Sequence, residues 1–101
     1  MYVITNAFPY EYWDGLTVKE HLMIIPQRHV KRIGDLDSQE LREYMDLLID
    51  YNKQGYTTYT RTPENTVLSQ EHLHTHLMTF DRKFRGRFIL LAGALGIRFI
   101  R

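Results

Sequence analysis

Three of the five histidines in this 101-residue chain occupy alternate positions, His72, His74 and His76. Successive side chains of a β-strand point to opposite faces, so residues two apart share a face. In a strand the three imidazoles would therefore stand on one side. Imidazole changes charge near neutral pH and serves as nucleophile, acid, base or metal ligand. The spacing predicts a site of covalent, proton-transfer or metal chemistry.

A zinc site is one alternative for these histidines. Two imidazoles two residues apart could share an ion, but His72 and His76 would stand about 13 Å apart at ~3.3 Å per residue. That separation is too large for two bonds of about 2 Å. Further ligands would have to come from His21, His29 or a carboxylate, because the chain has no cysteine. The plainest alternative is a histidine-rich strand on a solvated face, without chemistry.

Length and composition favour a single domain over residues 1–101. The hydrophobic share of 44% and the charged share of 25% are those of an ordinary globular protein. The net charge is only +1, although residues 82–101 carry six basic side chains and no acidic one. This basic segment either protects a strand edge or attracts a polyanion. No nucleic-acid-binding module is evident, so we do not expect a nucleic-acid partner.

The ends of the chain carry no targeting or membrane signal that we recognise. The first residues lack the charged region and apolar run of a signal peptide. The longest apolar stretch, residues 88–97, is interrupted by Gly93 and Gly96 and is too short to span a bilayer. We therefore expect a cytoplasmic protein without a membrane partner.

The hydrophobic pattern predicts strands on both sides of one long helix. Asp37 and Glu40 have the spacing of a capping box, apolar residues then recur at helical spacing, and Gly55 supplies a stop. We expect this helix over residues 37–54. Strands are expected at 21–25, 56–60 and 67–79, with a turn at 61–65 and a final strand pair at 88–92 and 97–100. This order is typical of an α+β fold with an antiparallel sheet.

Two histidine-bearing segments resemble the signatures of the histidine triad (HIT) family. Residues 72–78, His-Leu-His-Thr-His-Leu-Met, match the pattern His-φ-His-φ-His-φ-φ, in which φ is apolar. Residues 21–29, His-Leu-Met-Ile-Ile-Pro-Gln-Arg-His, match a strand and turn of the same family. The resemblance is strongest over residues 6–78 and implies a HIT-like antiparallel sheet with one long helix. In two departures, Thr75 takes an apolar position and Val67-Leu68-Ser69 replaces a glycine-containing approach to the triad.

The resemblance also implies roles for individual residues in a reaction at a nucleotide α-phosphate. It makes His74 the nucleophile, held by the backbone carbonyl of His72. It implies that His76 contacts the phosphate or leaving group and that His21 adds charge or a hydrogen bond. Nucleotide-binding roles fall to Ser69, on phosphate oxygens, to Asp14, on ribose hydroxyls unless it is a plain turn residue, and to His29. Three aromatic residues either wall a base pocket or pack in the core: Phe8, Tyr12 and Trp13.

The function that the resemblance implies is that of a nucleotide hydrolase or nucleotidyltransferase. It would act on dinucleoside polyphosphates or nucleoside phosphoramidates through a nucleotidyl-histidine. Phosphoryl transfer depends mainly on positioning and charge stabilisation, so no cofactor is expected at the triad, and Mg²⁺ would arrive only with the substrate. The alternative, left open by the altered approach at Val67-Leu68, is a nucleotide-binding or scaffold protein of the same fold with little turnover.

The resemblance further implies a homodimer that packs its helices, residues 37–54, near one another. A small domain leaves strand edges and helix faces to cover. Four residues widen the apolar surface of the predicted helix beyond a narrow stripe: Tyr44, Leu47, Leu48 and Tyr51. Packing of these residues on the domain's own sheet explains the pattern equally well.

Overall fold

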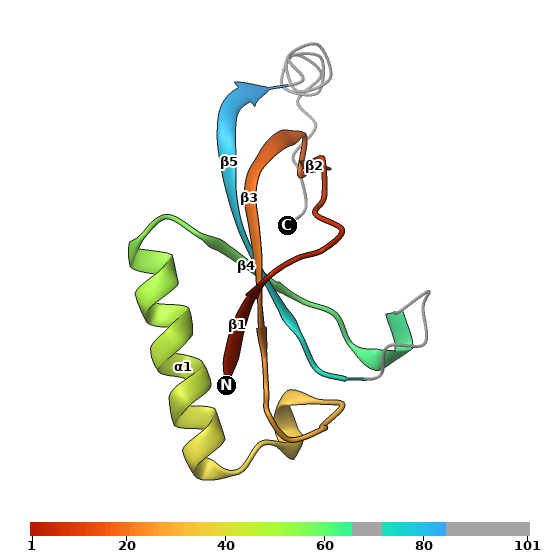
Figure 1. Cartoon of the computed structure of the whole chain (residues 1–101), viewed down its shortest axis with the longest axis vertical. Coiled ribbons are helices and arrows are strands. Elements are labelled where there is room, and N and C mark those ends of the chain that lie inside the picture. Colours follow the sequence, from red (N-terminus) through yellow and green to blue (C-terminus); the bar gives the residue numbers. More distant parts are fainter. Residues whose placement is uncertain (66–71, 85–101) are drawn as a thin grey trace, which may run out of the picture.

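The structure, a computed structural model, describes residues 1–65 and 72–84 (Figure 1). These residues form an antiparallel five-stranded sheet and one α-helix, which confirms the α+β class. The strand order is β1-β3-β5-β4, and the short β2 pairs with β3 outside that order. The elements are β1 (Tyr2–Thr5), β2 (Tyr12–Trp13), β3 (Leu16–Ile25), the 3₁₀-helix η1 (Ile33–Asp35), α1 (Ser38–Lys53), β4 (Thr57–Thr60), the 3₁₀-helix η2 (Pro63–Asn65) and β5 (Thr75–Phe84).

The single α-helix begins and ends where its sequence signals predict. The Asp37 side chain accepts a hydrogen bond from the Glu40 backbone N–H at 2.8 Å, and Glu40 accepts one from the Asp37 N–H at 2.9 Å. This reciprocal cap satisfies two N–H groups that a helix start leaves without partners. At the other end Gly55 takes a φ of 93°, which favours glycine and ends the helix. In the described residues, no helix has the length and apolar character needed to cross a membrane.

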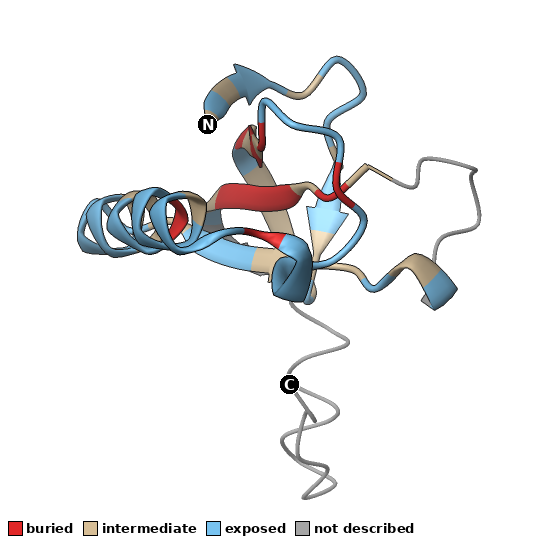
Figure 2. Cartoon of the chain, turned by 90° about the horizontal axis from the view of Figure 1, so that it is seen from below, coloured by how far each residue is buried: buried red, intermediate tan, exposed pale blue. Residues whose placement is uncertain are grey.

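Helix α1 covers one face of the sheet, and the hydrophobic core lies between them. The register puts Ile24 opposite Thr75 and Leu22 opposite Leu77, so these residues share a face. Tyr44 reaches from α1 to this face and its hydroxyl lies 2.8 Å from the Thr75 hydroxyl. Figure 2 shows buried residues, in red, gathered in the sheet beside the helix. Hydrogen bonds between buried hydroxyl groups thus join the helix to the strands, and each of these hydroxyls has a partner.

The opposite face of the sheet carries histidines. His21 lies opposite Met78, and His76 lies opposite Met23 on one side and Tyr59 on the other. Since alternate residues share a face, His21, His76 and Tyr59 point away from α1. The segment between β1 and β2 covers this face, because Tyr10 packs its ring against both histidines. The chain therefore buries both sides of the middle of its sheet.

The strand predicted over residues 67–79 is wrong at its start. Strand β5 begins at Thr75, so of the three alternating histidines only His76 lies in a strand. Residues before Thr75 have no strand to pair with, because β3 ends just before Pro26 and β4 ends at Thr60, opposite Thr75. Upstream, the Leu73 N–H donates instead to the carbonyl of Val30 at 2.7 Å.

Other boundaries differ from the prediction as well. Strand β3 starts at Leu16 rather than residue 21, and the pattern did not predict β1 or β2. The predicted turn at 61–65 contains the 3₁₀-helix η2. Residues 67–71 of the predicted histidine strand and the predicted strands at 88–92 and 97–100 lie outside the described residues.

Candidate functional site

Two buried histidines from neighbouring strands form the centre of the site. Nε2 of His21 lies 2.7 Å from Nδ1 of His76, and the two residues are only 3% and 4% exposed. A buried imidazole needs a hydrogen-bond partner for each nitrogen, and here each ring supplies one for the other. The two histidine-bearing motifs of the sequence thus meet in one buried pair.

The partners of this pair fix where each ring carries its hydrogen. The backbone N–H of Tyr10 donates to Nδ1 of His21 at 3.0 Å, so this nitrogen presents a lone pair. A neutral imidazole has one N–H. His21 therefore carries its hydrogen on Nε2 and donates it to Nδ1 of His76. His76 in turn carries its hydrogen on Nε2, which faces the Tyr10 hydroxyl at 3.5 Å.

Both members of the pair are neutral at pH 7. Burial lowers the pKa of His21, because the charged ring would lose its hydration. Burial, followed by electrostatic repulsion from the charged forms of His74, His21 and Arg61, lowers the pKa of His76 to about 4. His76 is therefore a hydrogen-bond donor through Nε2–H rather than a cation.

His74 has the opposite arrangement of its ring nitrogens. Its Nδ1–H donates to the backbone carbonyl of His72 at 3.0 Å, the contact that the family resemblance implies. This contact leaves the lone pair on Nε2, which has no hydrogen-bond partner among the described residues. The ring is half-buried, with its centroid 4.9 Å from that of His76 in an edge-on contact. A potential nucleophile thus lies beside a neutral N–H donor.

The side chains of His72 and His29 lie together beside the turn that follows β3. The His72 ring donates from Nε2 to the carbonyl of Pro26 at 3.1 Å. Its centroid lies 4.7 Å from that of the exposed His29, in an edge contact. Within the described residues, neither ring contacts the His21–His76 pair. His72 therefore serves His74 through its backbone carbonyl, and the rings of the motif do not line up on one strand face.

Aromatic rings surround the pair, and two of them, Tyr10 and Tyr59, were not predicted from the sequence. Tyr10 packs on both histidines, with centroids 4.6 Å from His21 and 5.2 Å from His76. Tyr59 of β4 stacks on His76 at 5.7 Å, and the Arg61 guanidinium lies over the Tyr59 ring at 5.5 Å. Trp13 joins Tyr59 at 4.4 Å. These rings exclude water from the imidazoles and hold one cation close by.

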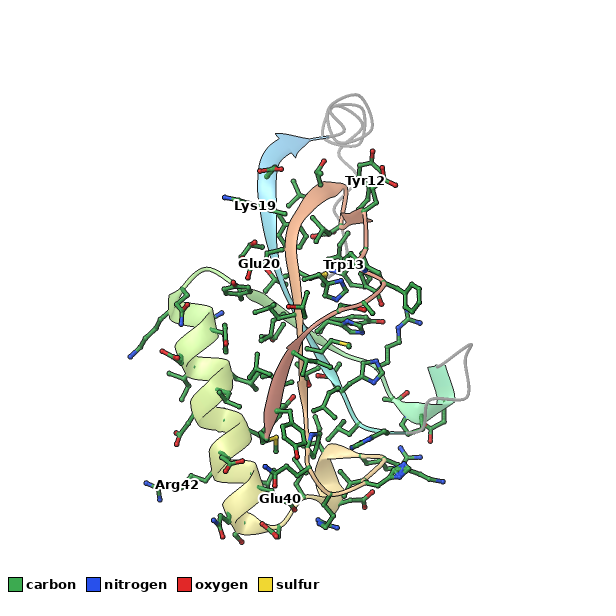
Figure 3. The ribbon with its side chains drawn as sticks, in the orientation of Figure 1. Tyr12, Trp13, Lys19, Glu20, Glu40 and Arg42 are labelled. Carbon is green, nitrogen blue, oxygen red and sulfur yellow. The ribbon has the colours of Figure 1, made fainter. Side chains whose placement is uncertain are left out.

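Of the three aromatic residues considered from sequence, only Trp13 is one of these rings. Phe8 is 87% exposed and Tyr12 is 40% exposed, whereas Trp13 is half-buried. Figure 3 labels Tyr12 and Trp13 at strand β2. Tyr59 could have been found if the β4–β5 register were known, because it lies opposite His76. Tyr10 and Arg61 lie outside strands, and no periodic pattern marks them.

Asp14, another predicted binding residue, lies in a turn of the sheet. Asp14 is exposed with a φ of 52°, and Gly15 follows with a φ of 75°, which is the two-residue turn joining β2 to β3. The turn explains Asp14 without any ligand. Ser69 lies outside the described residues.

No metal site is present in the part of the chain that the structure describes. No group of three or more histidine, aspartate or glutamate side chains there could hold an ion. In the central pair, the nitrogens that would face a shared ion are hydrogen-bonded to each other.

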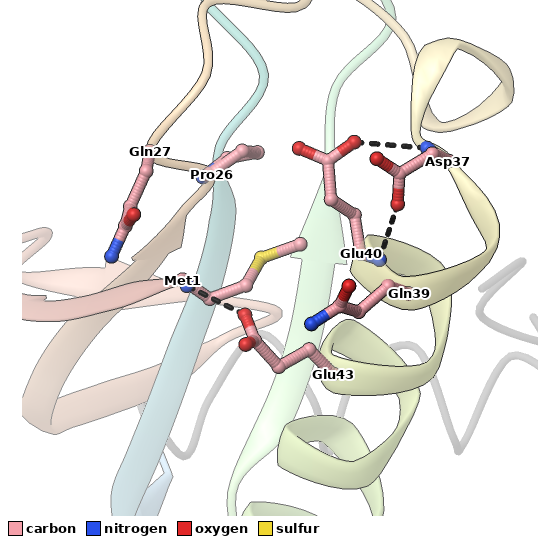
Figure 4. A pocket seen from close by; sticks show the side chains of 7 residues that line it. All are labelled: Met1, Pro26, Gln27, Asp37, Gln39, Glu40 and Glu43. Carbon is pink, nitrogen blue, oxygen red and sulfur yellow. Dashed lines mark hydrogen bonds and ion pairs between the residues drawn. The ribbon is translucent and has the colours of Figure 1, made fainter.

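A hollow of about 190 Å³ lies beside the start of α1, apart from the histidine cluster (Figure 4). Its carboxylates already have partners. Glu43 binds the ammonium group of Met1 at 2.7 Å, and Glu40 binds the guanidinium of Arg28 at 2.6 Å and caps the helix. These pairs explain the lining as structural, so the histidine cluster remains the candidate site.

Comparison with known proteins adds no neighbour. No protein-family model, curated protein or solved structure matches the chain.

Proposed function

We propose that this chain is a HIT-like nucleotide hydrolase or nucleotidyltransferase that attacks an α-phosphate through a nucleotidyl-histidine on His74. The observation that supports this most directly is the hydrogen bond from His74 Nδ1 to the His72 carbonyl. It holds the ring in the tautomer whose Nε2 lone pair is available for attack. A cytoplasmic location belongs to the same proposal.

The first step forms one bond and breaks one. Nε2 of His74 gives its lone pair to the α-phosphorus, and the bond to the leaving group breaks with its electron pair on the departing atom. The His74 ring becomes positive, and its Nδ1–H then binds the His72 carbonyl more strongly. The Nε2–H of His76 donates a hydrogen bond to an oxygen that gains negative charge.

The second step restores His74. Water, or another acceptor in the transferase, attacks the α-phosphorus, and the N–P bond breaks with its electron pair returning to Nε2. The acceptor's proton leaves to solvent or to the phosphate product. Neither step needs a metal at the histidines, and a cation on the substrate would act only on the phosphates.

The charge around the site matches an anionic substrate. Arg61 sits over Tyr59, whose ring stacks on His76, so a fixed positive charge lies close to the pair. A cation in a partly desolvated aromatic setting attracts phosphate more strongly than one in open solvent.

Trapping of the intermediate tests the function. The purified chain is mixed with a dinucleoside polyphosphate or a nucleoside phosphoramidate and denatured in alkali, where an N–P bond survives. Intact-mass and peptide spectra should show a nucleotidyl group on His74, removed by acid. Nucleotide binding with neither adduct nor turnover would instead support the scaffold alternative.

We further propose a homodimer built on α1. The residues considered from sequence pack in the chain's own core, with Tyr44 buried and Leu47, Leu48 and Tyr51 packed against it. The helix instead exposes a separate apolar stripe at four-residue spacing, formed by Leu41, Met45 and Ile49 at 39%, 51% and 49% exposure. Strand β4 ends the described sheet on one side. A second copy would cover this stripe and that edge together.

A further inference from the structure

The direction of the hydrogen bonds in the His21–His76 pair leaves no ring nitrogen that can accept an added proton. Nδ1 of His21 faces the Tyr10 N–H, and Nδ1 of His76 faces the Nε2–H of His21. A proton added to Nδ1 of His76 would set its N–H against the Nε2–H of His21 across 2.7 Å. A proton on Nδ1 of His21 would set two N–H groups against each other at 3.0 Å. The pair can take up a proton only if the Tyr10 contact breaks.

Asn6 does not relieve this constraint. Its side-chain oxygen accepts from the Phe8 N–H at 2.9 Å, so its amide nitrogen faces His21. That nitrogen is nearly equidistant from Nδ1 and Nε2 of His21, at 3.4 and 3.3 Å, and therefore does not distinguish between the two ring nitrogens. Asn6, like Tyr10, presents a donor to His21, and a donor opposes protonation.

Among the described residues, no acidic group faces His76 to favour its charged form. The titratable or charged groups that bear on it are His21 from β3, His74 from the preceding segment, Tyr59 and Arg61 from β4 and its end, and the Tyr10 hydroxyl from the covering segment. The Arg61 guanidinium, and the rings of His74 and His21 when they are charged, repel a proton on His76. The pKa of about 4 for His76 agrees with this geometry.

We propose that the Tyr10 backbone N–H keeps the His21–His76 pair neutral, so that His76 donates a hydrogen bond but cannot give up a proton. If the site acts as proposed above, it therefore takes dinucleoside polyphosphates rather than phosphoramidates. A phosphate leaving group departs as a stable anion when the P–O bond breaks, and the Nε2–H of His76 needs only to donate a hydrogen bond to it. An amine departs only with a proton. Supplying that proton from the neutral His76 ring would leave an imidazolate, which is a strongly unfavourable anion at pH 7.

Paired substrates test the leaving-group rule. A dinucleoside polyphosphate and a phosphoramidate of the same nucleoside share the reacting phosphorus and differ in the bond that breaks. For the unmodified chain at pH 7, kcat/KM should be greater for the polyphosphate by at least about 10-fold. Equal or greater kcat/KM with the phosphoramidate overturns the proposal.

Two substitutions at Tyr10 separate the backbone N–H from the ring. Tyr10→Pro removes both, whereas Tyr10→Ala removes the ring and keeps the N–H. The preference for polyphosphate should shrink several-fold in Tyr10→Pro relative to Tyr10→Ala, because Nδ1 of His21 is released only in the former. The same preference in both variants overturns the role of the N–H.

A measurement on the unmodified chain keeps the test independent of activity and of the proline variant's folding. ¹⁵N NMR of histidine-labelled protein reports which ring nitrogen bears hydrogen. His21 and His76 should both carry it on Nε2, without change from about pH 7 to about pH 5. Hydrogen on Nδ1 of His21, or proton uptake by the pair above about pH 6, overturns the proposal of a neutral pair. If these tautomers are observed but the chain gives neither turnover nor adduct, the proposed function and its leaving-group preference are wrong. The arrangement of hydrogens in the His21–His76 pair is then still confirmed.

Discussion

The histidines of this site differ in chemistry because one ring nitrogen of each meets a different partner. A carbonyl holds Nδ1 of His74 and leaves its Nε2 with a lone pair. The Tyr10 backbone N–H donates to Nδ1 of His21, so His21 carries its hydrogen on Nε2 and donates it to Nδ1 of His76. His76 then carries its own hydrogen on Nε2. The same side chain is thus an electron-pair donor at one position and a hydrogen-bond donor 4.9 Å away between centroids.

Removal of the proposed nucleophile should abolish turnover without unfolding the chain. His74→Ala is expected to lower kcat by at least about 100-fold, because no other group can form the covalent intermediate. Its stability should change little, since the ring is half-buried and makes one side-chain hydrogen bond. Steady-state kinetics and a thermal melt measure both. A variant that keeps more than about a tenth of kcat rules out covalent catalysis by His74.

The buried pair should make the fold sensitive to mild acid. The pKa of His76 is about 4 in the folded chain against 6.5 for a free imidazole. Below about pH 6.5 the His76 ring therefore binds a proton in the unfolded chain but not in the folded chain. The free energy of unfolding falls as the pH falls, until the ring also becomes charged in the folded chain near pH 4. Between pH 6.5 and 4.5 this amounts to about 2 kcal/mol, before His21 adds to it.

Urea unfolding at several pH values measures this loss. His76→Gln should flatten the pH dependence between pH 6.5 and 4.5, even though it costs stability at pH 7. The carboxylates of Glu40 and Glu64, whose pKa values Arg28 and Arg32 lower, begin to change stability near the acid end of this range, but they do so equally in the unmodified chain and in His76→Gln, so the comparison cancels them. An unchanged slope in the variant would mean that His76 titrates normally.

At the scale of elements, the sequence predicted those whose signals are local. Helix α1 needs only its own capping box and its Gly55 stop, and its predicted bounds hold. The start of β5 depends on where β3 and β4 stop offering partners, which no pattern within residues 67–79 reveals. The resemblance implies that His21 lies on the strand next to the triad, and in the structure His21 contacts His76, whereas the His72 ring lies against His29. Tyr10 escaped prediction because its role rests on a backbone N–H that every residue except proline has.

The helix cap offers a direct test of that local signal. Asp37→Ala should destabilise the chain by about 1 kcal/mol, because the Glu40 N–H at the helix start loses its acceptor. Asp37→Ser keeps an acceptor and should restore most of the loss. Urea denaturation of the three proteins gives the comparison. Equal destabilisation by alanine and serine would show that the carboxylate contributes through charge rather than as a cap.

At the scale of the whole molecule, the hydrophobic core and the candidate site lie on opposite faces of one sheet. The face under α1 holds the apolar core and the Tyr44–Thr75 hydroxyl contact. The other face holds the His21–His76 pair under Tyr10. Both faces share β3 and β5, so the residues that position the histidines are neighbours in sequence of the residues that bury the core. Ile24 and Leu77 alternate with Met23 and His76, and a shift of one residue in register would exchange the two faces.

The proposed dimer is a property of this arrangement, and Met45 tests it. Met45→Asp places a charge at the middle of the exposed stripe of α1, where the monomer leaves the side chain 51% exposed. The fold should therefore survive while association is lost, and in a two-fold interface the charge enters from both subunits. Met45→Leu keeps volume and apolarity and should remain dimeric. Light scattering at micromolar concentration should give twice 12.1 kDa for the unmodified chain and for Met45→Leu, and 12.1 kDa for Met45→Asp. A monomeric unmodified chain would end the dimer proposal and leave the histidine chemistry, which one chain supplies in full, unaffected.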